Sequence, residues 1–577
     1  MYPIKFLLIA VLVSVFGKGE ASMITDLTGE YRNGQVFLTW TESDLTDGTT
    51  LNVYASNQPI TSKNITSSTR VGHHIEPHSA QDWWQNPASF FKDEPPGIPA
   101  GFVIAEGSPP LDPQGGLFVH TATEKTQGAS YYAVTTTGPD GQEHLVLTPN
   151  ANTLQEPIAA LVAPIAPVYI GTEAALVQNA GKGKALIFSL HGRGGGYTAG
   201  GEKPKHVNYQ FFGNTKQGWR EGLAFKFHIE MTEEAIRVTP CDRQWTGGRP
   251  LTESHDKRDH CPAISTWYYG YPERIYETLD YENKVVPNYT EEQMLGIVQW
   301  AQDYLGVDPN QYYLTGGSMG GSGSVSLGFH HPEIFAHVDV NVPAIAYTPE
   351  GNLSRLNCFC GPLDDTVVTH KGEPFLEHMN GILTAQRTTA DLPFLIMRSG
   401  RTDRSIPWAN KPAFYAAMNT ARQAFVAYWS NGDHATADDD FPKDSHYAPA
   451  REKVQLDRSY LAFSNCSTNN NPGNGDAKDG DLEGWINRGL DWEDIIDTDS
   501  EYTVTVQAYY EDLTYPVVVD VTPRRLQAFR VTPGDKVTVR LSTGETHEMR
   551  ADEAGLLTIP KVQILNRDGT QIHLIKH

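Results

Sequence analysis

Apolar and polar residues alternate along the first quarter of the chain, the pattern of strands that bury one face. The alternation is clearest in residues 34–41, where Trp40 is predicted to face inward, and residues 51–60 indicate a second strand with a turn. A long stretch between about 61 and 114 departs from this pattern. We therefore predict a β-sandwich over residues 22–160 that carries an insertion.

The middle of the chain has a different pattern. Continuous apolar runs bounded by turn residues predict buried strands; these runs are 185–190, 392–397 and 425–429. Between the first two, apolar residues recur at helical spacing over 294–305. A capping-box pattern at 290–293 precedes this segment and Gly306 follows it, which predicts a helix that crosses over to the next strand.

Short alternating strands return in the last hundred residues and predict a second, small all-β unit over residues 483–577. Before it, segment 466–482 is rich in Asn, Gly and Asp, a composition typical of a flexible linker. The spacing of Asp476, Asp479 and Asp481 raises the alternative of a calcium site. The full ligand pattern is lacking, so a solvated turn is favoured.

One short motif carries the most chemical information. A β-like run at 313–315 enters Gly316-Gly317-Ser318-Met319-Gly320, a G-x-S-x-G turn that opens into a helix-compatible segment. A serine raised out of a sheet on so tight a turn needs neighbours without a Cβ atom, and the glycines meet that need. The amide end of the following helix favours a developing negative charge. Ser318 is therefore predicted to be a nucleophile, and the alternative is a flexible glycine-rich loop.

A second motif fits an oxyanion hole. The predicted strand 185–190 runs into His191-Gly192-Arg193-Gly194. Hydrolases that attack carbonyls pair the amide after the nucleophile with one from an early His-Gly loop. We predict the amide of Met319 as the first donor and that of Arg193 or Gly194 as the second.

The remaining parts of a catalytic triad follow in chain order. Asp403 comes shortly after the strand at 392–397 and is the predicted acid, and His434 follows 425–429 and is the predicted general base. The order Ser, Asp, His is that of α/β-hydrolases and not that of chymotrypsin or subtilisin. In this arrangement His434 takes the proton of Ser318, and Asp403 fixes the imidazole tautomer and stabilises its cation.

Each candidate has a plainer interpretation. Asp403 could be a turn residue or a cap before Pro407, and His434 is one of 20 histidines. The triad would be wrong only if the G-x-S-x-G turn, the His-Gly loop, Asp403 and His434 were all misleading together. The fallback residues are three acids and one base, Asp364, Asp365, Asp433 and His446.

On these motifs the region from about 168 to 462 resembles the α/β-hydrolase superfamily, especially its secreted esterase and polyester depolymerase branches and the catalytic domain of prolyl-oligopeptidase-type peptidases. The resemblance covers about half of the chain and rests on His191-Gly192, Gly316 to Gly320, Asp403 with Ile406-Pro407, and His434. It implies an α/β fold over residues 165–465, with a mostly parallel sheet and helices on both faces. The N-terminal β unit is similar to a fibronectin type III module with an insertion.

Length and charge narrow the possibilities. A chain of 577 residues exceeds one ordinary core, so two or three domains are expected. The formal net charge of -24 opposes binding to nucleic acid and to anionic membranes, and we expect neither as a partner. No cofactor is expected.

The N-terminus has the pattern of a signal peptide over residues 1–21. Lys5 precedes an apolar run at 6–16, and small residues follow at Gly19 and Ala21. No later segment approaches the roughly 20 apolar residues that a membrane span needs. We therefore predict a secreted or periplasmic protein without a membrane span.

Five cysteines fit an exported chain in which a few disulfides stiffen loops. Cys241 and Cys261 lie in one long loop and are candidates for one bridge. Cys358 or Cys360 is a candidate to pair with Cys466. Because five is odd, at least one cysteine stays free or pairs between molecules.

Candidate substrate-binding residues lie near the predicted site along the chain. They are His191 in the oxyanion loop, Trp245, Trp267 and Tyr268 in the cysteine-bearing loop, and Trp408 just after the predicted acid. Aromatic walls suit sugars, aryl esters and polyester units. The alternative is that these rings only bury the long loop.

The N-terminal insertion carries a group of histidines and tryptophans, namely His73, His74, His78, Trp83 and Trp84. A metal or sugar site there is possible in principle, but a packed, irregular loop is favoured. No metal is assigned.

Taken together, these features favour a secreted serine esterase acting through an acyl-enzyme on an extracellular polymer or its ester decorations. By resemblance, the leading substrates are feruloyl or acetyl esters of polysaccharides and hydroxyalkanoate polyesters. One alternative is a secreted prolyl-oligopeptidase-type peptidase, but the N-terminal region is too short and unrepetitive for the expected β-propeller. Another is a non-catalytic glycan-binding or adhesion protein, which the ordered triad disfavours. The substrate's acyl and alcohol parts and the oligomeric state stay open.

Overall fold

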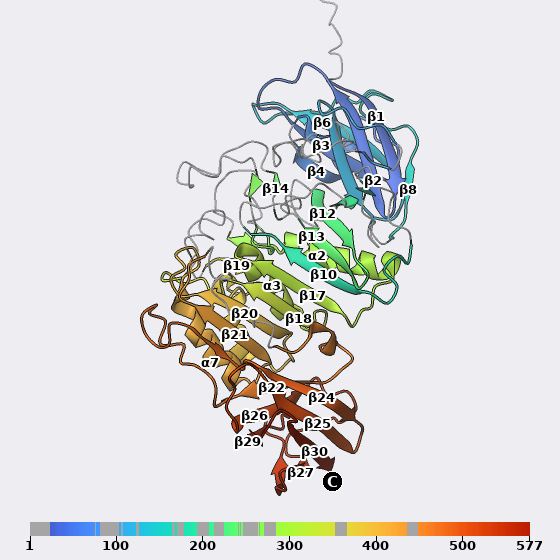
Figure 1. Cartoon of the computed structure of the whole chain (residues 1–577). Helices are drawn as coiled ribbons and strands as arrows, with labels where there is room; N and C mark the ends of the chain where they lie inside the picture. Colours follow the sequence, from blue (N-terminus) through green and yellow to red (C-terminus); the bar gives the residue numbers. More distant parts are fainter. Residues whose placement is uncertain are drawn as a thin grey trace, which may run out of the picture.

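The structure is a computed structural model that describes residues 23–75, 77–80, 103–105, 108–122, 126–163, 168–169, 178–192, 207–212, 224–240, 242, 244–245, 263–264, 266–270, 284–351, 353, 366–434 and 448–577. An N-terminal β unit, a central sheet with helices and a C-terminal β unit follow one another along the molecule (Figure 1). Within the described residues, no helix has the length and apolar character needed to cross a bilayer.

The N-terminal unit consists of antiparallel strands. One sheet has the order β1-β2-β5 and the other β4-β3-β6-β7, with β8 paired to β6. The elements are β1 (Ile24–Arg32), β2 (Gln35–Glu42), β3 (Thr50–Ser56), η1 (Ile65–Ser67), β4 (Thr69–Ile75), β5 (Gly116–Thr121), β6 (Gly128–Thr137), β7 (Glu143–His144) and β8 (Ile158–Ala160). β2 and β3 occupy the two predicted strand segments, and Trp40 is buried. The likeness to a fibronectin type III module stays a prediction.

The central sheet is mixed and has the order β23-β21-β20-β18-β17-β10-β13-β12-β11-β9. Its strands are β9 (Val168–Tyr169), β10 (Ala185–Leu190), β11 (Val207–Phe212), β12 (Ala224–Met231), β13 (Ala235–Pro240), β17 (Tyr312–Gly317), β18 (His337–Asn341), β20 (Phe394–Gly400), β21 (Phe425–Ser430) and β23 (Gly484–Ile486). The strands from β13 to β21 are parallel neighbours, and the pairs beyond them at both edges are antiparallel. The parallel centre of the predicted sheet is confirmed.

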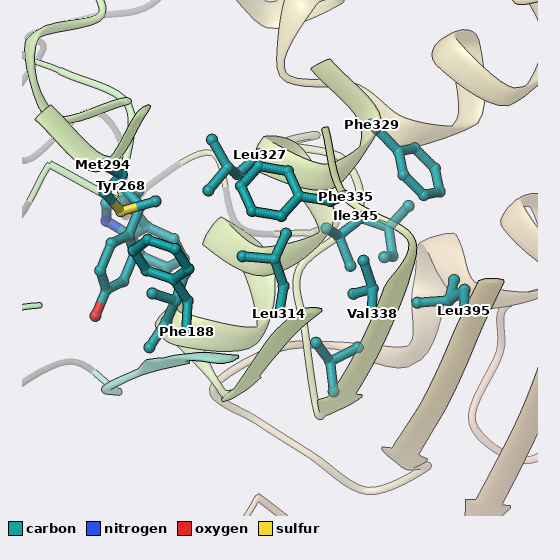
Figure 2. Packing of buried hydrophobic residues seen from close by; sticks show 14 of the residues in the cluster. Phe188, Tyr268, Met294, Leu314, Leu327, Phe329, Phe335, Val338, Ile345 and Leu395 are labelled. Carbon is teal, nitrogen blue, oxygen red and sulfur yellow. The ribbon is translucent and has the colours of Figure 1, made fainter. Parts of the chain in front are cut away.

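One face of this sheet is covered by helices. They are α2 (Tyr289–Trp300), α3 (Met319–His330), α5 (Phe375–His378), α6 (Gly381–Arg387) and α7 (Lys411–Thr420). Leu186 and Phe188 of β10 belong to the core that these helices share with the sheet, and Figure 2 shows Leu314 and Val338 of the next strands packed in it with Leu327 of α3. Burial of large apolar side chains stabilises such a core by about 1.5–3 kcal/mol each.

The opposite face of the sheet is covered by the C-terminal β unit. Ile187 of β10 points away from the helices and belongs to a second core, which it shares with Phe394, Tyr460 and Trp492. The Phe394 and Trp492 ring centroids lie 5.9 Å apart. The prediction of helices on both faces is therefore not met by the described residues, because strands cover this face instead.

The C-terminal unit has two sheets, with the orders β22-β26-β29 and β24-β25-β30-β27-β28. Its strands are β22 (Tyr460–Ser464), β24 (Leu490–Asp497), β25 (Glu501–Ala508), β26 (Val517–Arg524), β27 (Lys536–Leu541), β28 (Thr546–Arg550), β29 (Ile559–Ile564) and β30 (Thr570–Lys576). β22 belongs to this unit although it precedes residue 465, and β23 pairs in the central sheet although it follows residue 483. The predicted boundaries 165–465 and 483–577 are therefore wrong, because alternation reveals a strand but not the sheet it joins.

Segment 466–482 is not a free linker. Its turns are closed by side-chain to backbone hydrogen bonds, such as Gly473 N to Asn471 Oδ1 (3.0 Å) and Asn471 N to Asp481 Oδ2 (2.8 Å). The side chains of the central sheet bind its backbone, as described below. The many Asn, Gly and Asp residues form tight turns here rather than a flexible chain.

The expected bridge to Cys466 is also wrong. Cys466 is a free, buried thiol that lies 3.2 Å from the Thr468 hydroxyl, and burial raises the pKa of that thiol. The other four cysteines, Cys241, Cys261, Cys358 and Cys360, lie outside the described residues, so the second predicted bridge stays a prediction.

The predicted crossover helix differs from the structure at its start. α2 begins at Tyr289, and the Thr290 hydroxyl lies 2.7 Å from the Thr266 hydroxyl instead of capping the helix. A π-helical turn, η4 (Ala301–Leu305), extends α2 to Gly306, whose φ of 70° ends it as predicted. The remaining short elements are β14 (Gln244–Trp245), β15 (Ala263–Ile264), β16 (Val285–Val286), β19 (Val368–Thr369), η5 (Trp408–Asn410) and η6 (Arg451–Lys453).

Candidate active site

Ser318 stands on a sharp turn between β17 and α3. Its backbone has φ 58° and ψ -122°, a strained conformation for a residue with a side chain. The turn leaves no room for larger neighbours: a Cβ on Gly316 would lie 2.6 Å from the Gly320 carbonyl, and one on Gly320 would lie 2.0 Å from the Leu190 carbonyl oxygen. The glycines of the G-x-S-x-G motif are therefore required by the fold, and Ser318 is held clear of the sheet.

The structure brings the three predicted triad residues together at the carboxyl ends of the parallel strands. His434 Nε2 lies 2.8 Å from Ser318 Oγ, and His434 Nδ1 lies 2.7 Å from Asp403 Oδ2. The other carboxylate oxygen of Asp403 accepts the backbone amides of Ser405 (2.7 Å) and Ile406 (2.9 Å). With Nδ1–H donating to the carboxylate, Nε2 is left to accept the serine proton.

Of the four fallback residues, the structure describes only Asp433. Asp433 is exposed next to His434. Asp364, Asp365 and His446 lie outside the described residues.

The start of the predicted oxyanion loop lies against the nucleophile. A Cβ placed on Gly192 would be 3.6 Å from the Ser318 Cβ atom. Met319 is the first residue of α3, so its amide lies at the positive end of the helix dipole. Arg193 and Gly194 lie outside the described residues, and the second oxyanion donor stays a prediction.

His191 is held by backbone groups. Its Nε2 accepts the Asp242 amide (2.8 Å), and its Nδ1 lies 2.8 Å from the Gly192 carbonyl oxygen. These contacts place the imidazole proton on Nδ1. The hydroxyl of Tyr268 donates to the His191 carbonyl oxygen (3.0 Å), so the entry to the oxyanion loop is fixed from two sides.

The aromatic candidates that the structure describes are packed in the interior. Trp267, Tyr268 and Trp408 are all buried. The Trp267 ring packs edge-on against Tyr347, and the Trp408 ring packs against Trp429. The side chain of Trp245 lies outside the described residues. A substrate-binding role for these residues stays a prediction.

Two buried charged groups near the site were not predicted. Burial raises the pKa of Asp242 to about 7, although its carboxylate accepts hydrogen bonds from Thr266 and Tyr268. Burial lowers the pKa of Lys411 to about 7, and the charge of Asp403 opposes that shift. The Lys411 ammonium donates to the Pro343 carbonyl. Neither residue stands in a recognisable sequence motif. Its burial can therefore be seen only in the folded structure.

Among the other groups considered from the sequence, the side chains of His73 and His74 and the residues Trp83 and Trp84 lie outside the described residues. His78 Nδ1 lies 2.8 Å from the Gln114 carbonyl oxygen, and Asp476 and Asp481 accept backbone amides within their own loop. Across the described part of the chain, no cluster of three or more His, Cys, Asp or Glu residues is arranged to hold a metal ion.

Residues 254–424 match the family model described as "Putative esterase". The matched segment contains Ser318 and Asp403 and ends before His434. The match supports an esterase of the α/β-hydrolase superfamily. No curated protein matches the sequence.

Several solved structures resemble part of the chain. S-formylglutathione hydrolase from Agrobacterium tumefaciens is 13% identical, with 56% of this chain and 91% of that chain covered and a TM-score of 0.30. A ferulic acid esterase is 16% identical, with 44% and 80% covered and a TM-score of 0.24. The apo form of Thermogutta terrifontis esterase 2 is 16% identical, with 45% and 77% covered and a TM-score of 0.24. Likeness at this level says nothing about activity or substrate.

Proposed function

We propose that this protein is a serine carboxylic-ester hydrolase that uses Ser318, His434 and Asp403 as its triad. The observation that carries the proposal is the pair of hydrogen bonds that link the three side chains, at 2.8 Å and 2.7 Å. The strained backbone of Ser318 and the family-model match support it independently.

The chemistry would follow from the positions of these atoms. As Ser318 Oγ attacks the ester carbonyl carbon, its proton passes to His434 Nε2, and Asp403 stabilises the imidazolium. The amide of Met319 and one from Arg193 or Gly194 hold the tetrahedral oxyanion. When the intermediate collapses, His434 returns the proton to the leaving alcohol oxygen. A water molecule then attacks the acyl-enzyme by the same route and releases the carboxylic acid.

The substrate we propose is an extracellular polymer or its ester decorations, such as a feruloyl or acetyl group on a polysaccharide or a polyester. The signal-peptide pattern at residues 1–21 supports export. We propose a secreted or periplasmic location on the same pattern.

The test is hydrolysis of a matched panel by the wild type, Ser318→Ala and Ser324→Ala. The panel holds short-chain aryl esters, methyl ferulate, acetylated xylan and a chromogenic peptide. Ser324 lies on α3, the helix that follows Ser318, and its buried hydroxyl donates to the Gly320 carbonyl (2.9 Å), so its variant controls for losing a serine hydroxyl in this region. We expect ester turnover to vanish in Ser318→Ala and to persist in Ser324→Ala.

Three other results would change the assignment. Turnover of the peptide alone would favour the peptidase alternative, and ester turnover that survives in Ser318→Ala would contradict the triad. A wild type silent on every substrate would favour the binding-protein alternative.

A further inference from the structure

Arg401 is a buried cation in the loop that carries the proposed acid, two residues before Asp403. Its side chain is almost fully buried, and in the contacts described it meets backbone carbonyls rather than a carboxylate. Its five N–H groups donate to the carbonyl oxygens of Ala477 (3.1 Å, from Nε), Pro472 (3.3 Å) and Asp481 (2.9 Å, both from Nη1), and Asp476 (3.1 Å) and Asp479 (both from Nη2). Every donor of the guanidinium is thus satisfied by one short segment.

We call residues 471–484 the strap. Two indole groups next to the site bind it as well. Trp408 Nε1 donates to the Pro472 carbonyl (3.2 Å), and Trp429 Nε1 donates to the Asp481 carbonyl (2.8 Å). The Arg401 guanidinium lies 4.9 Å from the centre of the Trp408 ring, which adds a cation–π contact.

The strap leads directly into the sheet beside the proposed general base. β23, which begins at Gly484, pairs antiparallel with β21, and Trp429 lies opposite Gly484. β21 ends at Ser430, four residues before His434. The strap therefore contacts the acid loop through Arg401 and the strand of the base loop through Trp429.

The two catalytic loops are also joined to each other. Arg401 N donates to the Ser430 carbonyl (2.9 Å), and Thr402 N donates to the Gly432 carbonyl (3.0 Å). A Cβ on Gly400 would lie 2.6 Å from the Gly432 carbonyl oxygen, so the loops approach as closely as glycine allows. A shift of the acid loop would carry the base loop with it.

The strap and Arg401 depend on each other energetically. Three of the five carbonyl oxygens, those of Pro472, Asp476 and Asp481, also accept a second donor. Those of Ala477 and Asp479 therefore depend most on the guanidinium, since an unsatisfied buried polar group is costly. A buried guanidinium without partners would be costlier still. Burial lowers the pKa of Arg401, and the carboxylates of Asp479, Asp476 and Asp481 oppose that shift. The cation is thus stabilised by the field of the strap as well as by its hydrogen bonds.

We propose that Arg401 is a positioning residue of the hydrolase: by binding the strap it fixes the acid and base loops, so that Asp403 and His434 keep the hydrogen bond the triad needs. The inference rests on the proposed function. It gives the strap a role in positioning the triad, although the strap lies beyond residues 254–424, the part of the chain that matches the family model.

The first test compares Arg401→Lys with Arg524→Lys in the full-length chain. Arg524 is an equally buried arginine that links the C-terminal unit to residues before β20, through Asp391 Oδ1 (2.6 Å) and the Ala390 carbonyl (3.1 Å). That end of the strand is opposite to the site. Both variants should lose a similar amount of thermal stability. In Arg401→Lys we expect kcat to fall roughly tenfold or more with KM within about twofold, since a displaced catalytic group costs turnover rather than binding. In Arg524→Lys kcat should stay within about twofold.

A milder pair of substitutions tests the positioning role if Arg401→Lys does not fold. Trp429→Phe removes the indole N–H that binds the strap at Asp481, and Trp485→Phe removes a comparable bond to the Thr468 carbonyl (3.1 Å), farther from the triad. We expect a roughly threefold lower kcat, and an equally slowed labelling of Ser318 by an aryl phosphonate, in Trp429→Phe only.

The outcomes separate this inference from the proposed function. Turnover that survives in Ser318→Ala would overturn both. If Ser318→Ala is inactive but kcat falls equally within each pair, or within neither, the positioning role is overturned and the proposed function stands.

Discussion

The two β units of this protein are joined to the central sheet in different ways. Among the described residues, those buried in the N-terminal unit, Trp40 and Val134 included, form clusters that contain no residue of the central sheet. Those of the C-terminal unit, such as Tyr460 and Trp492, share one core with the central sheet. Sequence alternation looks the same in both, so an all-β segment can be an attached module or a structural layer, and only the partner of its buried face decides which.

The largest expected effect comes from deleting each β unit in turn and comparing the two truncated chains. Removal of residues 466–577 would expose the face of the central sheet that holds Phe394 and Tyr428, and would delete the strap. We expect this truncated chain to be insoluble or inactive, because several large apolar side chains would lose burial worth about 1.5–3 kcal/mol each. Removal of residues 1–160 should leave a folded enzyme with nearly unchanged kcat. Soluble yield, circular dichroism and ester turnover measure both, and an active chain ending at 465 would contradict the shared core.

A matched tryptophan pair tests the same difference without deletion. Trp492→Ala and Trp40→Ala each remove a buried indole and should each cost about 3–5 kcal/mol. In Trp492→Ala the loss should lower the melting temperature of the unit that carries the activity. In Trp40→Ala a separate unfolding transition should shift to a lower temperature, while activity should be lost at the same temperature as in the wild type. Calorimetry together with residual activity after heating distinguishes these results, and a common shift in both variants would show that the N-terminal unit is coupled too.

Acid should destabilise both the central sheet and the N-terminal unit through buried histidines. Burial lowers the pKa of His337 in the central sheet and of His120 in the N-terminal unit, each to about 4. Because the folded-state pKa is depressed, the stability that the neutral ring contributes is present above the unfolded value of 6.5 and is lost as the pH falls from there to about 4. The full change is about 3 kcal/mol per histidine.

Replacing His337 should remove this pH dependence of stability from the central sheet but not from the N-terminal unit. Its ring stacks on Phe394 at 5.9 Å, and neither ring nitrogen has a hydrogen-bond partner in the described structure, so His337→Phe should be tolerated. We expect a raised melting temperature at pH 4 to 5 for the transition that abolishes activity, with little change at pH 8. A shift of equal size at both pH values would contradict the titration of His337.

The smallest effect concerns single tyrosine hydroxyls. Tyr460 OH donates to the Leu392 carbonyl (2.7 Å) across the shared core, whereas Tyr31 OH donates to the Leu161 carbonyl (3.0 Å) at an exposed place. Tyr460→Phe should cost about 1 kcal/mol, and Tyr31→Phe less, with kcat unchanged in both. Urea denaturation followed by fluorescence measures the difference. A larger loss in Tyr31→Phe would reverse the expected order.

The spatial grouping of Ser318, Asp403 and His434 could be predicted because its signals are local. The glycines around Ser318 are demanded by a turn of a few residues, and Asp403 and His434 each follow a recognisable buried strand. The strap could not be predicted in this way. Arg401 and the carbonyls that it binds are 71 to 80 residues apart, and backbone carbonyls leave no trace in the side-chain pattern. The composition of segment 466–482 indicated turns correctly but not that the turns would enclose a cation.

The same limit explains the misplaced domain boundaries. β22 and β23 are both short strands next to the predicted linker, and each pairs with a strand on the other side of the expected border. The pattern of a strand records that one side is buried. It does not record whether the covering layer is a helix, as over Phe188, or a β-sheet, as over Ile187.

The shared core also sets an order of events during synthesis. The chain is made from its N-terminus, and domains generally fold as they emerge. The N-terminal unit is expected to fold early, since its described core clusters contain no residue of the central sheet. The central sheet is not, because its second face is covered by residues that are translated after Ser318, Asp403 and His434. A ribosome that has already released all three proposed triad residues therefore still holds an incompletely folded sheet, and the proposed activity is expected only when the C-terminal strands have covered that sheet.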